Sequence, residues 1–450
     1  LSGEVELEAL LEIINSSARL AITEYKKHGN NVPTIYSTEF HPLDFATDTV
    51  ALKKAIRLLE DACQQLCASL APPQHTLANV TPICHSINDS WFAQCYDWAC
   101  TGAAIRKGIA DILEKYPSGL HIRELSQTVG LEKGKLARIL RVLASKRCFI
   151  EVDTDVFASN RLSLIMKSSN DCGCLTCIHA QDVSQGTGVL YETLTEPEYA
   201  MSYEPDKAPM IYVLKRKGLK GSFFGWMKAD NYHHAMIALG PVMGSLSILH
   251  HYPWNDVATV CDVGASVGSV SISLSKAHPH LKITDQDLPE VLEAARSVWE
   301  KEAFEALREK RVEFLTLDFS KEAPVPGKDV YYLRNIIHDW PDAEAAVILR
   351  NISKAMEPHS RLLIHDYVIA GANRRPDEEQ LGIDIAPEPM LPNFGAGNSR
   401  KYQQDLNMWI LHNAKERTVG DQITLASASG LRLANVYDLA GTAVLEFRLA

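Results

Sequence analysis

A histidine behind an apolar run is the residue of this sequence best suited to acid–base chemistry. His338 follows Val330–Leu333, which is typical of a buried strand, and precedes Asp339 and Trp340. A neutral imidazole is the side chain best matched to removing a proton near pH 7. Two carboxylates could hold its tautomer and stabilise the imidazolium: Asp366, at the end of the next predicted strand, and Glu416. We predict that these three residues form a catalytic group.

A glycine and two acidic residues stand at the ends of three other predicted strands. Thr259–Gly268 has the pattern of a strand, a glycine-containing turn and the start of a helix. Asp287 follows about 20 positions later, where a carboxylate can bind ribose hydroxyls, and Asp318 ends the strand after it. Ligands of open α/β sheets bind at the carboxyl ends of the strands. Gly264, Asp287 and Asp318 therefore predict a cofactor site.

Strand-like and helical segments alternate over residues 232–450. The predicted strands are Thr259–Val263, Leu281–Thr284, Val312–Leu317, Val330–Leu333 and Arg361–Tyr367. The helices predicted between them are Val270–Ala277, Glu290–Ala306 and Ala343–Met356. This alternation predicts an α/β domain with a mostly parallel sheet.

The residues before this domain show two other patterns. From Val5 to about Ala71 the apolar residues recur at helical spacing, which is broken at Asn30–Pro33 and ended by Pro72-Pro73. A predicted helix, a helix-turn-helix and a hairpin then follow at Ile105–Leu113, Ile122–Leu125, Leu136–Leu143, Phe149–Val152 and Val156–Ala158. This order is typical of a winged helix. We predict a helical extension (1–74), a winged-helix dimerisation domain (75–165), a helical connector (166–231) and a catalytic domain (232–450).

The composition narrows the class of protein. The 450 residues are 46% hydrophobic and 22% charged, with a net charge of −11. A net-acidic chain lacks the basic surface that binds nucleic-acid phosphates, so we expect no nucleic-acid partner. No apolar stretch approaches the ~20 residues of a membrane span, and Leu1–Glu6 lacks the features of a signal peptide. With ten cysteines and no secretory signal, we expect a cytoplasmic protein with reduced thiols and no membrane partner.

Together these residues carry a resemblance to a known family. Over roughly residues 75–450 the chain resembles the plant caffeic-acid-type and fungal O-methyltransferases, and its N-terminal extension is similar to that of fungal members. The markers are Asp262-Val263-Gly264 with Gly268, Asp287-Leu288-Pro289, the segment from Arg334 to Trp340, and Lys415-Glu416-Arg417-Thr418. The chain departs from the family at Ala265, where glycine is common, and at Asp366, where Glu is common. The resemblance implies a Rossmann-like domain that binds S-adenosylmethionine (SAM), behind a winged-helix domain that forms a homodimer.

The resemblance also implies roles for the residues at the cofactor. Gly264 would lie against the methionine part of SAM, and Asp287, with Leu288 beside it, would bind the ribose. The adenine would be contacted by Asp318, Phe319 and Arg334.

For the reaction, the resemblance implies that His338 removes the proton of a phenol while Asp366 and Glu416 flank its ring. The phenol oxygen then attacks the methyl group of SAM in line, and no metal is required. We expect a substrate pocket built from residues near Trp226–His234 and from Met408, Trp409, His412 and Asn413, because aromatic and sulfur side chains suit a flat ring.

Three alternatives stay open at this point. Some fungal relatives keep SAM but catalyse pericyclic or dehydrative steps, and these tend to replace the base at the position of His338. A winged helix could bind DNA, and its second helix carries Lys133, Lys135, Arg138 and Arg141; a non-catalytic regulator is the reading from another class. Cys172, Cys174 and Cys177 with His179 could hold zinc, but their spacing is irregular and we expect no metal.

Overall fold

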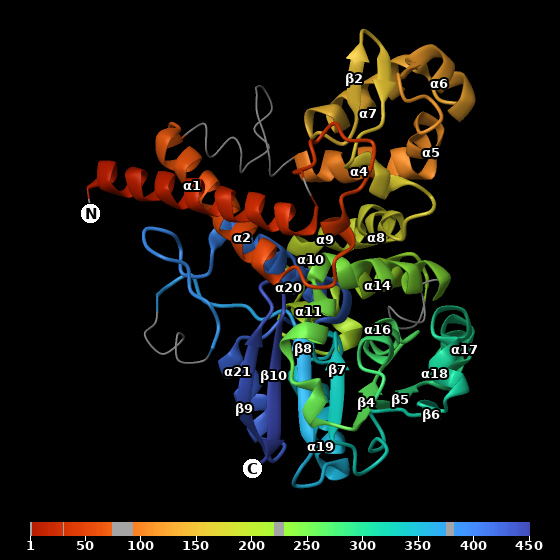
Figure 1. Cartoon of the computed structure of the whole chain (residues 1–450), viewed down its shortest axis with the longest axis vertical. Coiled ribbons are helices and arrows are strands. Elements are labelled where there is room, and N and C mark those ends of the chain that lie inside the picture. Colours follow the sequence, from red (N-terminus) through yellow and green to blue (C-terminus); the bar gives the residue numbers. More distant parts are fainter. Residues whose placement is uncertain (1, 30, 74–92, 220–228, 375–381) are drawn as a thin grey trace.

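A seven-stranded sheet organises the C-terminal half of the chain (Figure 1). The computed structural model describes residues 2–29, 31–73, 93–219, 229–374 and 382–450. In spatial order the strands are β6 (Val312–Thr316), β5 (Lys282–Asp287), β4 (Thr259–Val263), β7 (Val330–Arg334), β8 (Arg361–Asp366), β10 (Ala443–Leu449) and β9 (Leu431–Asp438). The first five are parallel, whereas β10 runs antiparallel to both β8 and β9.

The five predicted strands are confirmed, with β5 extending to Asp287, and two further strands complete the sheet. β9 and β10 were not predicted. Both lie in an antiparallel pair at one side of the sheet, so no crossover helix separates them. Their sequence therefore lacks the strand–helix alternation on which the prediction rested.

Alternate residues of the buried strands enter two hydrophobic cores, one on each face of the sheet. Val260 and Tyr332 pack into one core, while their neighbours Cys261 and Tyr331 pack into the other. This follows from the period of two in a strand, and it explains why these strands read as continuous apolar runs.

Helices cover both faces. Those that pack around the sheet are α16 (Ser269–Ala277), α17 (Pro289–Glu302), α18 (Phe304–Arg308), α19 (Asp342–Ala355) and α21 (Val419–Ser427). The single helix predicted over Glu290–Ala306 is wrong, because it is two helices. Ala303 leaves the helical conformation (φ −145°, ψ 44°) and packs into the core, where it is 7% exposed.

The chain order places a cleft at one point of the sheet. From β4 the chain moves outward through β5 to β6, and then returns to β7 on the other side of β4. Such a switch leaves a crevice at the carboxyl ends of the two strands that flank it. Gly264 follows β4, and Arg334 ends β7 at this crevice.

The N-terminal half is mostly helical. Its helices are α1 (Gly3–His28), α2 (Val50–Leu70), α4 (Ala93–Arg106), α5 (Ile109–Leu113), α6 (Ile122–Val129) and α7 (Lys133–Ser145). A small sheet of β1 (Leu120–His121), β3 (Val156–Ala158) and β2 (Ile150–Asp153) accompanies them. The predicted helix-turn-helix and hairpin are present, but the helix predicted over Ile105–Leu113 is interrupted at Gly108, which is left-handed (φ 59°).

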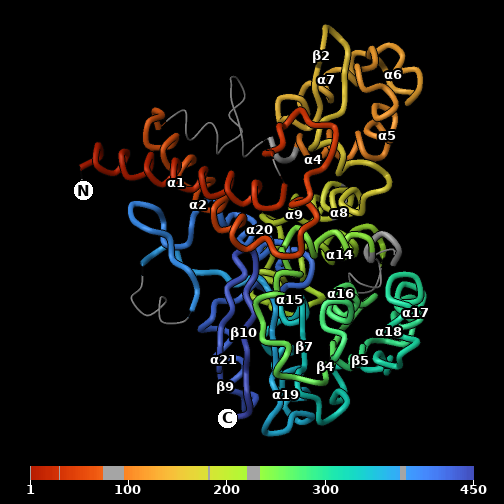
Figure 2. Tube along the Cα trace, in the orientation of Figure 1, coloured from red at the N-terminus to blue at the C-terminus, as the bar shows by residue number. Residues whose placement is uncertain are grey.

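A layer of connecting helices, which we call the helical roof, covers the carboxyl ends of the sheet strands. They are α8 (Cys172–Ile178), a π-helical turn (His179–Val183), α9 (Ser184–Thr187), α10 (Leu190–Thr195), α11 (Pro197–Ala200) and α12 (Pro209–Arg216), joined by α14 (Ala229–Met243) and α20 (Ser399–His412). In Figures 1 and 2 they lie between the sheet and the small N-terminal sheet. Ile178, Met210, Ala235 and Ile410 share one apolar cluster within this roof.

The first two helices pack against each other and onto a late segment of the chain. Leu10 of α1 and Ala62 of α2 form a cluster with Ala386, Met390 and Phe394. Residues 75–92 of the predicted winged-helix domain lie outside the described residues, and the four domain boundaries stay predictions. No helix in the described ranges is both long and apolar enough to span a membrane.

Candidate active site

One large cavity opens at the crevice beside β4 and β7. Its volume is about 570 Å³. All six residues predicted at the cofactor line it: Gly264, Asp287, Leu288, Asp318, Phe319 and Arg334. Ser266, Ser269 and Trp340 are also in its wall.

The turn after β4 depends on glycine at one position. Gly264 is left-handed (φ +74°), and a Cβ there would lie 2.4 Å from Ile336 Cδ1. Ser266 is also left-handed (φ 52°), whereas Ala265 is not. The alanine at 265, where the family commonly has glycine, therefore causes no backbone strain in this turn.

Asp287 is held at the edge of the same turn. Its Oδ2 accepts a hydrogen bond from Ser266 N (2.8 Å), and its Oδ1 accepts one from Leu288 N (2.8 Å). Both donors are backbone groups, so the carboxylate is fixed at the cavity wall as an acceptor. This suits hydrogen bonding to a pair of hydroxyl groups.

The remaining cavity residues are anchored from different elements. Phe319 packs edge-on against Trp340, with ring centroids 6.0 Å apart. Asp318 pairs with Lys321 (2.7 Å), and this pairing lowers the pKa of the carboxyl. Arg334 donates to Ser245 Oγ (3.2 Å) and to Ser269 Oγ (3.0 Å), which begins α16.

His338 lies on the wall of a second, smaller cavity beneath the helical roof. This cavity has a volume of about 60 Å³. Met236, Asn335 and Asp339 line both cavities, so the two adjoin. An apolar cavity that holds benzene has a volume of about 150 Å³. An aromatic ring therefore fits only after side chains move, and the flexible Met236 and Met408 in the wall suit that.

Two carboxylates contact the ring of His338, which is 4% exposed. Nδ1 is 2.7 Å from Glu416 Oε1, and Nε2 is 3.5 Å from Asp339 Oδ1. Asp339 Oδ1 is also 3.6 Å from His412 Nε2. Asp366 lies nearby but accepts its hydrogen bond from the Asn335 backbone N–H (2.9 Å), and within the described residues it has no hydrogen bond to His338.

The buried charges set the protonation of this group. Burial by itself would lower the pKa of His338, but the charges of Glu416, Asp339 and Asp366 raise it to about 10. Burial raises the pKa of Glu416 to about 7, against the opposing effect of His338. The buried acids therefore favour the protonated form of the imidazole, and the imidazolium in turn favours the ionised form of Glu416.

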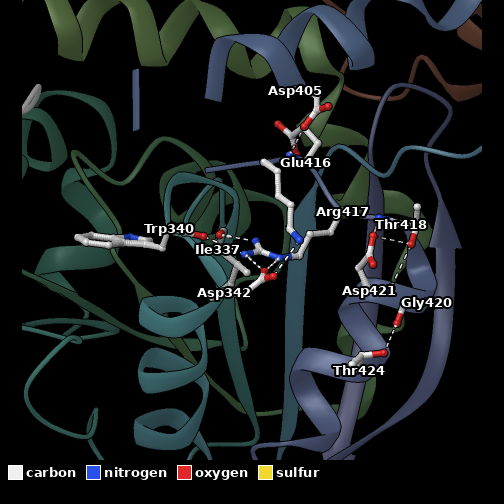
Figure 3. Close-up of polar contacts among 11 residues, drawn as sticks. Ile337, Trp340, Asp342, Asp405, Glu416, Arg417, Thr418, Gly420, Asp421 and Thr424 are labelled. Carbon is white, nitrogen blue, oxygen red and sulfur yellow. Dashed lines mark hydrogen bonds and ion pairs between the residues drawn. The ribbon is translucent and has the colours of Figure 1, made fainter. Parts of the chain in front are cut away.

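A buried arginine joins the loop that carries His338 to the segment that carries Glu416 (Figure 3). The side chain of Arg417 is fully buried and donates to Ile337 O, Trp340 O and Asp342 Oδ1, each at 2.8 Å. The Glu416 backbone N–H donates to Asp405 Oδ1 (2.8 Å). These bonds hold the His338 loop in a fixed position against Glu416.

The predicted substrate pocket is present only in part. Met408 and His412 line the His338 cavity, whereas Trp409 and Asn413 do not. The Asn413 amide instead donates to Ser202 O (2.8 Å) and Glu204 O (2.9 Å). In the predicted stretch near Trp226–His234, residues 226–228 lie outside the described residues, and the exposed His234 bonds to Asp171.

Several lining residues escaped the sequence prediction. Asp339 was given no role, although it stands next to His338 in the motif. Gln404 and Leu411 were not predicted either, and they line the cavity together with the predicted Met408 and His412. Their spacing of i, i+4, i+7 and i+8 marks one helix face, and this signal could have separated them from Trp409 and Asn413.

The three cysteines that could have formed a zinc site lie on α8. Cys172, Cys174 and Cys177 are partly buried. His179 lines the His338 cavity and packs near Trp98. The described residues contain no group of three or more His, Cys, Asp or Glu placed to hold a metal.

Comparison with known proteins adds independent information. The sequence profile of the O-methyltransferase domain matches residues 232–432. The chain is 35% identical over 451 residues to 3-O-methyltransferase 2 of Phanerochaete chrysosporium, covering 98% of this chain and 97% of that protein. Two solved structures share the fold. They are the mitomycin 7-O-methyltransferase MmcR (TM-score 0.64, 22% identity, 84% and 98% coverage) and a pericyclic reaction enzyme (TM-score 0.66, 20% identity, 88% and 94% coverage).

Arg417→Lys tests the link between the two halves of the site. A lysine cannot reproduce the fork that satisfies two carbonyls and a carboxylate in a buried place. We expect a loss of about 2–4 kcal/mol in the free energy of unfolding, measured with urea, and a lower turnover number. Arg308→Lys, at an exposed position (62%) at the end of α18, is the matched control and should change both quantities little. Wild-type stability and turnover in Arg417→Lys would contradict the role.

Proposed function

Because the chain belongs to the O-methyltransferase family, we propose that it methylates a hydroxyl of a small phenolic or polyketide-type molecule with His338 as general base. One observation carries this proposal. His338, paired through Nδ1 with buried Glu416, lines a cavity that adjoins the one lined by all six cofactor residues. A proton acceptor and a cofactor site are thus neighbours.

The residues of the large cavity fit SAM. Asp287 offers two carboxylate oxygens to the ribose hydroxyls, and Phe319 offers a ring face or edge to the adenine. Arg334, held by Ser245 and Ser269, is better suited to the carboxylate of the methionine part than to the adenine, because a guanidinium pairs with carboxylates. When bound, SAM supplies a methyl group activated by a sulfonium.

His338 acts on the acceptor hydroxyl through Nε2. Glu416 keeps Nδ1 protonated, so Nε2 carries the lone pair once the ring is neutral. Nε2 accepts the proton of the acceptor hydroxyl as the hydroxyl oxygen attacks the methyl group. The carboxylates of Glu416 and Asp339 stabilise the imidazolium that forms. Positive charge in the adjoining cavity lowers the pKa of His338, which favours the neutral ring that the step needs.

Met236 and Met408 supply an apolar, adjustable wall for a flat ring. Their side chains also exclude water from the reacting oxygen. We propose that Asp366 contributes charge near His338 and fixes the Asn335 backbone, rather than contacting the ring.

His338→Gln is the direct test of the reaction. We expect turnover to fall by about 10²–10⁴, with SAM affinity by calorimetry nearly unchanged, because the base acts only in the chemical step. The assay measures S-adenosylhomocysteine released with a panel of phenols. His359→Gln, a surface histidine with 52% exposure, should match wild type.

Two results would overturn the assignment. Product formed by wild type without S-adenosylhomocysteine would identify a pericyclic or dehydrative reaction on the same fold. Unchanged turnover in His338→Gln would show that another group takes the proton.

The pH dependence tests the carboxylates. A base with a raised pKa is neutral only at higher pH, so kcat/KM should rise with pH in the wild type. Glu416→Gln removes the charge that raises the pKa of His338 but keeps a hydrogen-bond acceptor. The acid limb should therefore move to lower pH, while Glu357→Gln on the surface leaves it in place. A limb that stays fixed in Glu416→Gln would disprove the coupling.

We also propose that the protein is a homodimer. In support, α1 exposes apolar side chains, including Leu11 (40%), Leu20 (55%) and Ile22 (42%). Light scattering at micromolar concentration should give about twice the chain mass of 49.9 kDa. A mass equal to that of one chain would refute the dimer.

A further inference from the structure

A third cavity lies at the N-terminus of α20 and shares no lining residue with the two cavities of the candidate active site. Its volume is about 140 Å³. Its walls come from α2, from the end of α14, from the turn between β9 and β10, and from the start of α20. Segments far apart in the sequence therefore meet around it.

Positive charge dominates this cavity, which we call the cationic cavity. Four basic side chains line it, Lys53, Arg57, Arg400 and Lys401, against one acidic side chain, Glu60. Asp384 lies behind Arg57, to which it is bound at 3.1 Å, and it also pairs with Lys54. Asp438 is near Lys401 but is not part of the lining. The nearby acids therefore leave the space itself with an excess of cations.

Two of the buried cations have donors without a partner. Lys401 is 5% exposed and lines the cavity, and the acids near it act on it by charge alone, without a hydrogen bond or ion pair among the described residues. Arg57 is also 5% exposed, and its Nε is buried without an acceptor among the described residues. A buried, unpaired ammonium is costly, and burial lowers the pKa of Lys401 to about 8. An anion in the cavity would remove that cost.

The start of helix α20 adds to the positive charge around the cationic cavity. α20 has 14 residues, and its N-cap, Asn398, makes no side-chain capping bond. Gly397, Asn398, Arg400 and Lys401 of this terminus line the cavity. A 3-10 helix, Gly395–Asn398, runs directly into α20, and the Ser399 N–H is bonded to Ala396 O. The start of α20 therefore contributes the positive end of the helix dipole, which favours an anion.

We propose that the cationic cavity is a second binding site, for a small anion of the phosphate or carboxylate type. The volume admits a compact anion, and the four cations supply the charge. Lys53, whose Nζ already donates to Val242 O (2.8 Å), and Arg57 would fix the orientation of the ligand, whereas Lys401 would pair with it directly.

The site would act on the helix that carries the substrate pocket. α20 presents Gln404, Met408, Leu411 and His412 to the His338 cavity. Tyr367, which follows Asp366 in sequence, lines the cationic cavity. An anion at the first turn of α20 would therefore stabilise the same helix that forms one wall of the candidate active site.

Thermal unfolding in the presence of inorganic phosphate tests the proposal. The full chain is saturated with S-adenosylhomocysteine so that Arg334 is covered, and sodium chloride keeps the ionic strength constant. We expect a saturable rise in Tm with phosphate in the wild type. Lys401→Met should reduce phosphate affinity at least tenfold without lowering the ligand-free Tm, because it removes an unpaired buried charge. Lys276→Met, an exposed lysine on α16, should behave as wild type.

A parallel titration with succinate separates the two ligand chemistries: stronger stabilisation by phosphate identifies a phosphoryl group, and stronger stabilisation by succinate identifies a carboxylate. Arg400→Gln changes an exposed residue and serves if Lys401→Met does not fold; it should weaken binding several-fold. The proposal is overturned if neither anion stabilises the wild type beyond chloride. It is also overturned if the cavity variants bind as tightly as Lys276→Met.

Discussion

Arg417 is the side chain on which the geometry of the site depends. Its guanidinium donates hydrogen bonds to the carbonyl oxygens of Ile337 and Trp340, which lie on either side of His338 in sequence. Arg417 itself directly follows Glu416 in the chain. The loop after β7 would otherwise bury two acceptors without donors, which is unfavourable in a dry interior. One buried cation thus closes the loop and brings the imidazole within 2.7 Å of the carboxylate that holds it.

The surroundings of His338 and the cationic cavity bury an excess of charge of opposite sign. Around His338 the acids outnumber the bases, which raises the pKa of the imidazole and favours its protonated form. At the start of α20 the basic side chains that line the cationic cavity outnumber the acidic ones, and the carboxylates that act on Lys401 lie outside its lining. Both places therefore gain most from a ligand of a definite sign, a cation in one and an anion in the other.

The helical roof connects these sites. α20 begins at the cationic cavity and ends with His412 at the wall shared with Asp339. α14 runs beneath the connector helices and contributes Met236 to both cavities of the candidate active site. The proposed reacting hydroxyl would thus be enclosed by helices, while the residues proposed to bind the cofactor lie at or just after the ends of sheet strands.

Local patterns in the sequence determined the parallel core of the sheet and the residues that line the large cavity at its edge. Each of Gly264, Asp287 and Asp318 stands at the end of an apolar run, and parallel topology brings such ends together without further information. Only the tertiary structure decided which side of α20 faces His338, that Asp339 rather than Asp366 lies beside its ring, and that β9 and β10 complete the sheet. Those features depend on contacts between segments far apart in the chain, whose packing angles are not encoded in any single stretch of residues.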